Sequence, residues 1–137
     1  MKRIIYLALV VVLVSCKSAE PVKVPNASEV QKVEVMAGAM EQRKVLAVIT
    51  EKKKIDELLT FIKANNSDWY KPWDTYPTPQ ATAIFRSSSD APLLILWLGP
   101  NWVGGQGMPQ GPKAAKLWKL EEEKLMTLKR LLGVDSV

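Results

Sequence analysis

The sequence of 137 residues contains no histidine and only one cysteine. Without histidine, the chain has no imidazole for a catalytic triad, a zinc site or proton transfer near neutral pH. The single cysteine, Cys16, has no partner for an internal disulfide, so packing alone must stabilise the folded part. We therefore expect neither a metal ion nor another cofactor.

The glycine-rich segment 99–111 lacks the residues of a phosphate-binding loop. Gly105 follows Gly104 at the position where a P-loop requires lysine. Gln110 stands where the dinucleotide-binding fingerprint requires its third glycine. Glycine and proline are ordinary residues of loops, so we expect a mobile loop that follows a hairpin.

The first fifteen residues have the order of an export signal. Lys2 and Arg3 are followed by an uninterrupted apolar run over residues 4–14 and by a small residue, Ser15. The apolar run is shorter than the roughly 20 residues that a membrane-spanning helix needs. It therefore favours a cleaved signal peptide over a permanent transmembrane helix.

The residues Leu13-Val14-Ser15-Cys16 resemble the lipobox of bacterial lipoproteins. This resemblance implies that Cys16 receives a diacylglycerol, that the chain is cut just before it, and that the new amino group is acylated, with palmitate a typical chain. It also implies a lipid anchor in the cell envelope. Lys17 follows Cys16 in place of the Asp that retains lipoproteins in the inner membrane, which favours the outer membrane if the host is Gram-negative. The whole chain looks like small bacterial lipoproteins of unknown function, and the resemblance carries over no catalytic residue.

Signal cleavage lowers the formal net charge from +5 to +3, because Lys2 and Arg3 are lost. Such a mild excess of positive charge does not indicate binding to nucleic acid. Residues 16–28 mix proline, serine and charge, which predicts a flexible tether after the lipidated cysteine. At about 3.3 Å per residue, that tether would extend up to roughly 40 Å. Residues 29–137 then form a single domain.

Apolar periodicity predicts an α+β fold for this domain. Ile55, Leu58, Leu59 and Ile62 form the apolar stripe of a first helix, with Thr50 as a possible N-cap and a stop at Asn65. Leucines over residues 125–132 mark a closing helix, with acidic residues first, basic residues last and Gly133 as its C-terminal cap. The predicted strands cover residues 30–36, 44–50, 81–86, 93–98 and 116–120. A turn at residues 99–101 leads from the fourth of them to a short further strand at 102–103.

The predicted order of these elements is ββαβββα. We therefore expect an antiparallel sheet of about four to six strands with two helices packed on one face.

The segment 68–80 contains four aromatic residues and three prolines, a composition that excludes an ordinary helix. These aromatic side chains either close the core or form an exposed contact surface. Trp102, on the following hairpin, joins the proposed surface, whereas Trp97 and Trp118 lie in strand-like runs and are expected in the core. The candidate ligand-binding residues are Trp69, Tyr70, Trp73, Tyr76 and Trp102.

Carboxylates offer an alternative reading. Asp68 and Asp74 flank the aromatic residues, and a pair of carboxylates beside aromatic platforms is typical of a glycosidase. The same residues are common turn formers. A further alternative concerns the lysines at 52–54, which oppose the dipole at the start of the first helix and would suit an anionic surface.

The function that the sequence favours is a lipid-anchored envelope protein with a non-enzymatic protein- or glycan-binding domain. The alternative is a small carboxylate-dependent hydrolase acting on an envelope glycan.

Overall fold

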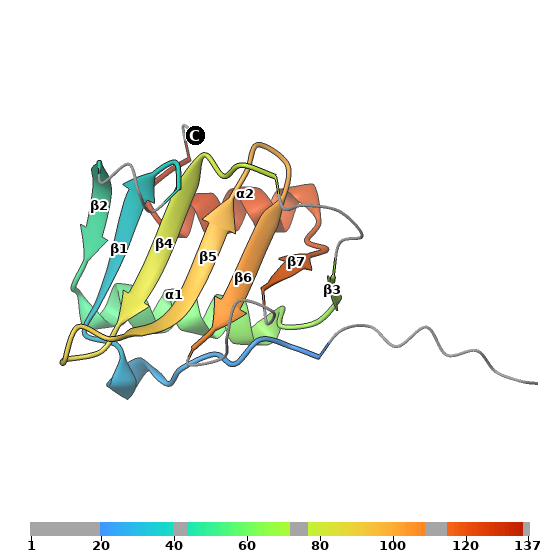
Figure 1. Cartoon of the computed structure of the whole chain (residues 1–137). Coiled ribbons are helices and arrows are strands. Elements are labelled where there is room, and N and C mark those ends of the chain that lie inside the picture. Colours follow the sequence, from blue (N-terminus) through green and yellow to red (C-terminus); the bar gives the residue numbers. More distant parts are fainter. Residues whose placement is uncertain (1–19, 40–43, 72–76, 109–114, 136–137) are drawn as a thin grey trace, which may run out of the picture.

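The computed structural model describes residues 20–39, 44–71, 77–108 and 115–135. It shows a seven-stranded antiparallel sheet in the order β2-β1-β4-β5-β6-β7-β3. Figure 1 shows two helices behind the sheet. The elements are a 3₁₀ helix η1 (Ala27–Glu29), β1 (Lys32–Ala37), β2 (Val45–Ile49), α1 (Lys52–Ala64), β3 (Trp69–Tyr70), β4 (Ala81–Arg86), β5 (Pro92–Leu98), β6 (Val103–Gly107), β7 (Lys116–Trp118) and α2 (Glu122–Leu131). The predicted α+β class is confirmed, with one strand more than the expected range.

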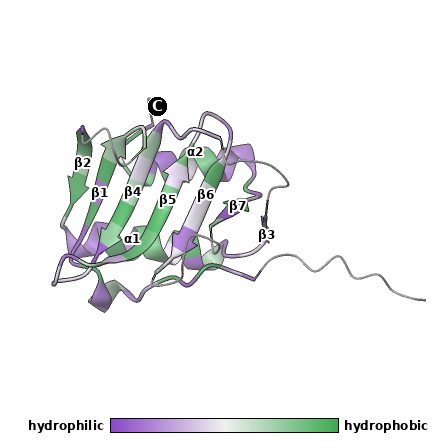
Figure 2. Cartoon of the chain, viewed as in Figure 1, coloured by the Kyte–Doolittle hydropathy of each residue, from purple (hydrophilic) through white to green (hydrophobic). Residues whose placement is uncertain are grey.

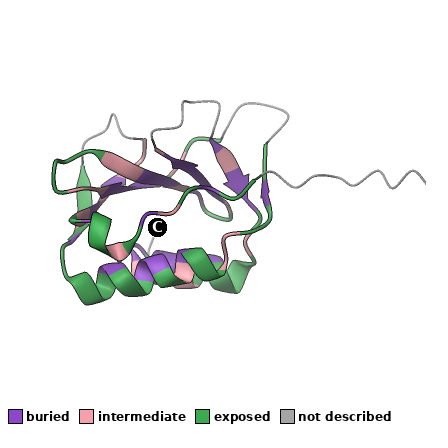
Figure 3. Cartoon of the chain, turned by 90° about the horizontal axis from the view of Figure 1, so that it is seen from below, coloured by how far each residue is buried: buried purple, intermediate pink, exposed green. Residues whose placement is uncertain are grey.

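The main core lies between the sheet and the two helices. In Figure 3 both helices lie on one side of the sheet and turn buried residues towards it. The predicted stripe of α1 is buried, and Leu125, Leu128 and Leu132 complete the core from α2. Alternate residues of the central strands fill the sheet side, including Val33, Phe85 and Leu96. Figure 2 shows that β2 and β5 are hydrophobic along most of their length.

The C-terminal end of α2 follows the sequence prediction closely. Gly133 has a φ of 75°, and its N–H donates to the Arg130 carbonyl at 3.0 Å. The Val134 N–H donates to the Lys129 carbonyl at 2.9 Å. These two bonds form a Schellman motif, in which a left-handed residue satisfies the last helical carbonyls. At the other helix, α1 begins after Glu51 instead of Thr50 and ends at Asn65 as predicted.

The glycine-rich segment is the main departure from the predicted fold. Residues expected in a mobile loop form β6, a fully buried strand paired with β5 and β7. A Cβ atom at Gly105 would lie 2.8 Å from Trp69 Cη2, and one at Gly107 would lie 2.9 Å from the Lys23 carbonyl oxygen. Glycine is disfavoured in strands by its entropy, but here it makes room for an indole and for another backbone.

The N-terminal segment is also more ordered than the sequence predicts. Val22 is only 3% exposed and belongs to the main core, and its carbonyl accepts a hydrogen bond from Asn66 Nδ2 at 2.9 Å. Lys116 Nζ donates to the Glu20 carbonyl. Val22 and the residues that follow it are therefore part of the fold and not of a flexible tether, whereas residues 16–19 of the expected tether lie outside the described residues.

Candidate functional site

The face of the sheet opposite the helices carries a second, smaller apolar cluster. It is formed by Met36, Ile84 and Ile95, with Trp97 and Met108 packed against them. No helix of the described chain covers this face (Figure 3). When one face of an antiparallel sheet packs on the core, the other face normally carries polar residues that are exposed to water. On this face, Trp97 and Met108 remain only half-buried beside the small cluster.

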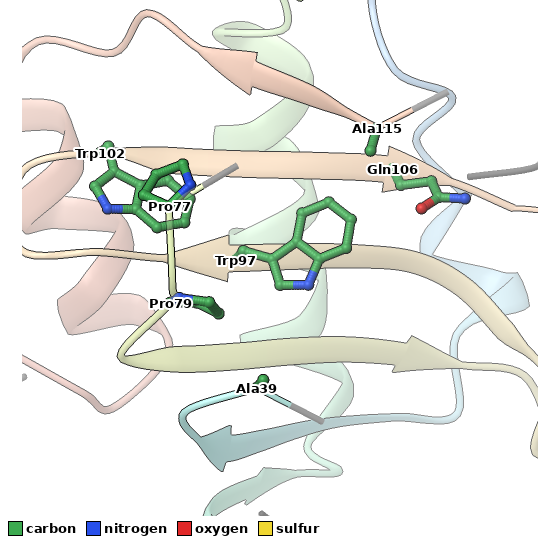
Figure 4. A pocket seen from close by; sticks show the side chains of 7 residues that line it. All are labelled: Ala39, Pro77, Pro79, Trp97, Trp102, Gln106 and Ala115. Atoms are coloured by element: carbon green, nitrogen blue, oxygen red, sulfur yellow. The ribbon is translucent and has the colours of Figure 1, made fainter. Parts of the chain in front are cut away.

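A groove of about 410 Å³ opens over this face beside the small cluster. That volume lies in the lower part of the range for small-ligand sites. Figure 4 shows Trp97 at the centre of the groove, with Trp102 and the two prolines towards one end and Gln106 and Ala115 towards the other. Its lining consists of Ala39, Pro77, Pro79, Trp97, Trp102, Gln106 and Ala115. Only one of these side chains is polar and none is charged.

The floor of the groove depends on a glycine in the neighbouring strand. Trp97 of β5 pairs with Gly104 of β6 on one side and with Thr82 of β4 on the other. A Cβ atom at Gly104 would lie 3.3 Å from Trp97 Cε3 and 3.4 Å from Leu117 Cδ2. The missing side chain therefore lets the Trp97 ring lie across β6.

Trp102 is positioned by the turn between β5 and β6. Gly99 N–H donates to the Trp102 carbonyl at 2.9 Å, which leaves Pro100 and Asn101 at the tip of the hairpin. A Cβ atom at Gly99 would lie 1.7 Å from Trp102 Nε1. The Trp102 indole therefore lies directly on the Gly99 backbone, a position that only glycine leaves open.

The connection after β1 forms another wall. Gly38 has a φ of 65°, a conformation that favours glycine, and it precedes Ala39 of the groove. The buried Thr82 hydroxyl donates to the Gly38 carbonyl at 2.8 Å, and Gly38 N–H donates to the Gln80 carbonyl at 2.6 Å. These two bonds fix Ala39 beside the sheet.

The four described tryptophans in and around the core differ in their hydrogen bonds. Trp69 Nε1 donates to Asn66 Oδ1 at 2.8 Å, and Trp118 Nε1 donates to the carbonyls of Asn65 and Ser67, both at 3.0 Å. Trp97 and Trp102 are half-buried, and neither indole N–H donates a hydrogen bond within the described part of the chain. Both of these tryptophans line the groove.

Charged residues gather at the far end of the same sheet face. Lys32 Nζ lies 2.9 Å from Glu34 and 3.3 Å from Asp90, and Arg86 Nε lies 3.1 Å from Glu34. The hydrogen bonds to Glu34 and Asp90 raise the pKa of Lys32 above its ordinary value. These charges neutralise one another and do not line the groove.

The predicted aromatic surface is only partly present. Trp69 is completely buried and stacks on Trp118, with ring centroids 4.7 Å apart and an interplanar angle of 13°. It is therefore a core residue, contrary to the predicted ligand-binding role. Tyr70 is 45% exposed on edge strand β3 but does not line the groove, whereas Trp102 does. Trp73 and Tyr76 lie outside the described residues.

Trp97 differs from its prediction in the opposite way to Trp69. Its strand-like surroundings predicted a core position, yet it forms the groove floor. The alternation along β5 contains the signal, because Leu94, Leu96 and Leu98 face the helices and the residues between them face the groove side. An aromatic residue out of phase with the core leucines marks the other face.

Of the two carboxylates of the alternative reading, Asp68 is described and does not line the groove. Asp68 is exposed, has a φ of 59° and its carbonyl accepts a hydrogen bond from the Lys119 N–H at 3.0 Å. Asp74, like Cys16, lies outside the described residues. The lysines at 52–54 are all exposed, and Lys54 lies 3.6 Å from Glu51.

The described residues offer neither a metal site nor a membrane-spanning helix. No three His, Cys, Asp or Glu side chains among them are placed to hold a metal ion. Within the same described ranges, no helix has the length and apolar character of a membrane span.

A protein family described as a domain of unknown function (DUF5300) matches residues 18–87 of the chain. The match extends from the ordered N-terminal segment to the end of β4, so it includes Ala39, Pro77 and Pro79 of the groove but not Trp97 or Trp102. No curated protein and no solved structure matches the sequence.

Proposed function

The chain belongs to this family of unknown function, and we propose that it is a lipid-anchored envelope protein whose domain binds another protein without catalysing a reaction. The groove over the open sheet face is the proposed binding site. The observation that carries this proposal is the apolar lining of the groove by two half-buried tryptophans on a sheet face that no helix covers in the described chain. Aromatic residues in such positions are typical anchors of protein interfaces.

A protein ligand suits the groove better than a glycan. Sugar hydroxyls donate and accept hydrogen bonds, so a buried sugar needs several polar partners on the protein. Among the described residues of the lining, only the Gln106 amide and the two indole N–H groups are polar side-chain groups. Trp97 and Trp102 offer flat rings for stacking, but most hydroxyls of a buried sugar would lose their hydrogen bonds to water. An apolar protein segment loses far fewer.

Photo-crosslinking tests the site in the intact envelope. A photoreactive residue at Pro77, on the groove wall, is expected to give a discrete crosslinked protein that mass spectrometry identifies. The matched control is Ser88, which is exposed in the turn between β4 and β5. The product from Pro77 should disappear in Trp97→Ala, provided that circular dichroism shows a folded variant. Equal products from Pro77 and Ser88 contradict the proposal.

The lipid anchor rests on the lipobox resemblance at Cys16 and has its own test. Cys16→Ser is expected to abolish incorporation of labelled palmitate and to shift the protein from the membrane fraction to the soluble fraction. Unchanged membrane partition in this variant would exclude lipidation at Cys16 as the anchor. The proposal of a binding groove does not depend on this result, because Cys16 is not among the residues that line the groove, which run from Ala39 to Ala115.

A further inference from the structure

We propose that the groove recognises a proline-rich segment in the polyproline II conformation. This inference rests on the proposed function, because it assigns a ligand class to the same groove. It follows from three properties of the site: its place on a sheet face, the kind of hydrogen-bonding groups it presents and the residues that form its walls.

The place of the groove excludes recognition by strand addition. The strands beneath it, β1, β4, β5 and β6, each pair with a neighbour on both sides. Their backbone groups are therefore occupied, and a ligand cannot extend the sheet there. A bound segment must find its hydrogen-bond partners among side chains. This requirement favours a ligand whose backbone needs few partners.

Proline meets this requirement better than any other residue. It has a carbonyl acceptor and no N–H donor. The groove presents the indole donors of Trp97 and Trp102, which make no hydrogen bond within the described residues. Polyproline II segments have no internal hydrogen bonds, so their carbonyls are available to such donors. Gln106 lies at the opposite end of the groove from Trp102 (Figure 4).

The walls match the apolar part of the same ligand. Trp97 presents a ring on the floor, and Trp102, Pro77 and Pro79 line one end. Rigid aromatic and prolyl surfaces lose little conformational freedom when another ring packs on them. Aromatic-lined grooves are the recurring solution for binding proline-rich segments, because the ligand is already extended before it binds.

An acyl chain is the rival occupant, and it fits less well. Hydrocarbon offers no acceptor to the Trp97 and Trp102 indole N–H groups, which would lose water without gaining a partner. A short phospholipid therefore serves as the competing probe.

The test uses a chain that begins at Lys17. All buried core residues lie between Val22 and Val134, so this chain keeps every one of them. Indole N–H signals are followed by ¹H–¹⁵N nuclear magnetic resonance while an acetylated and amidated decaproline peptide is added. A glycine-serine peptide of the same length is the control ligand. Trp97→Phe and Trp102→Phe assign the signals.

Decaproline is expected to shift the signals of Trp97 and Trp102, while those of the buried Trp69 and Trp118 stay in place. Trp102→Phe keeps an aromatic ring but removes a donor, and we expect it to weaken binding about 2–10-fold, the effect of one net hydrogen bond. Tyr70→Phe removes an exposed hydroxyl outside the groove and should leave the affinity unchanged.

Three results overturn the inference. Equal shifts with the glycine-serine peptide show that proline is not recognised. Shifts with diheptanoyl phosphatidylcholine but not with decaproline assign the groove to lipid. No shift with decaproline, together with a specific crosslink from Pro77, leaves the protein-binding proposal intact and removes only the ligand class. Failure of both experiments removes both proposals.

Discussion

At the scale of single residues, the glycines decide where the tryptophans lie. Gly99, Gly104 and Gly105 each face an indole, those of Trp102, Trp97 and Trp69 respectively. Two of these indoles belong to the groove and the third to the core. The same residue type therefore serves binding and stability, and substitutions at the three positions should separate the two roles.

Gly99→Ala is expected to disturb the groove more than the fold. The new Cβ would occupy the place of the Trp102 indole, which lies 1.7 Å away. Because Trp102 is only half-buried, its ring can move outward at a cost of about 1 kcal/mol. We expect increased acrylamide quenching of tryptophan fluorescence and weakened decaproline binding. The quenching increase should vanish when Gly99→Ala is combined with Trp102→Phe; if it persists, another tryptophan has moved.

Gly105→Ala should instead destabilise the domain. Its Cβ would lie 2.8 Å from Trp69 Cη2, and Trp69 is completely buried against Trp118. Overpacking of a core costs about 1–3 kcal/mol. Gly104→Ala is the matched comparison, because its nearest atom would be 3.1 Å away. Urea unfolding should rank Gly105→Ala as the less stable variant, and the reverse order would contradict this account.

The residue scale also shows where sequence reasoning stops. Trp69, for which both a core and a contact position were open, lies in the core, whereas Trp97, expected in the core, lines the groove, because the position of an aromatic residue depends on which face of the sheet its strand turns it to. Strand β3 has only two residues, so the sequence pattern does not show which of its side chains faces the core. The glycines of β6 led to the prediction of a loop. The groups that occupy the space beside Gly105 and Gly107 come from β3 and from the N-terminal segment. Such contacts are distant in sequence.

At the scale of elements, local signals were sufficient for the helices. The apolar stripe of α1 and Leu125 and Leu128 of α2 are buried as their spacing predicts. The strands at residues 81–86 and 92–98 likewise follow their apolar runs. The apolar residues of these elements recur at the spacing of a helix or a strand, so each element can be recognised from its own sequence. The short strands β3 and β7 instead form by pairing with each other and, for β7, with β6.

The cap of α2 provides a test that involves conformation alone. A Cβ at Gly133 would meet only Ala47 Cβ, at 3.8 Å, an ordinary contact. The cost of Gly133→Ala is therefore the left-handed φ of 75°, about 1–2 kcal/mol. Gly133→Asn should lose less, because asparagine tolerates this conformation. Thermal unfolding of the two variants should give that order, and equal losses would indicate a steric cause.

The N-terminal segment behaves as an element of the fold, and its attachment can be tested. Val22 is buried, and its carbonyl accepts a hydrogen bond from Asn66, which also accepts one from Trp69. Val22→Asp should bury an unpaired charge and release the segment. Limited proteolysis is expected to cut this variant near residues 20–26 while the remainder stays resistant. Ser28→Asp, at an exposed site, is the control and should resist cleavage.

At the scale of the whole molecule, the ordered N-terminal segment changes how the domain would sit on a membrane. If Cys16 carries lipid, only four peptide units separate it from Glu20, whose carbonyl accepts a hydrogen bond from Lys116. At about 3.3–3.6 Å per residue, those units span at most roughly 14 Å. Ala115, next to Lys116, lies at the Gln106 end of the groove. The proposed binding site would therefore open close to the lipid surface.

This arrangement predicts that distance from the membrane controls access to the groove. Energy transfer from a fluorophore at residue 115 to labelled lipid headgroups should be high for the lipidated chain in nanodiscs. Inserting twelve glycine and serine residues after Lys17 should lower the transfer, because a flexible linker of that length adds roughly 20 Å of mean extension. Decaproline affinity should stay the same, since the insertion lies outside the groove. Unchanged transfer would mean that contacts other than the short tether hold the domain at the membrane.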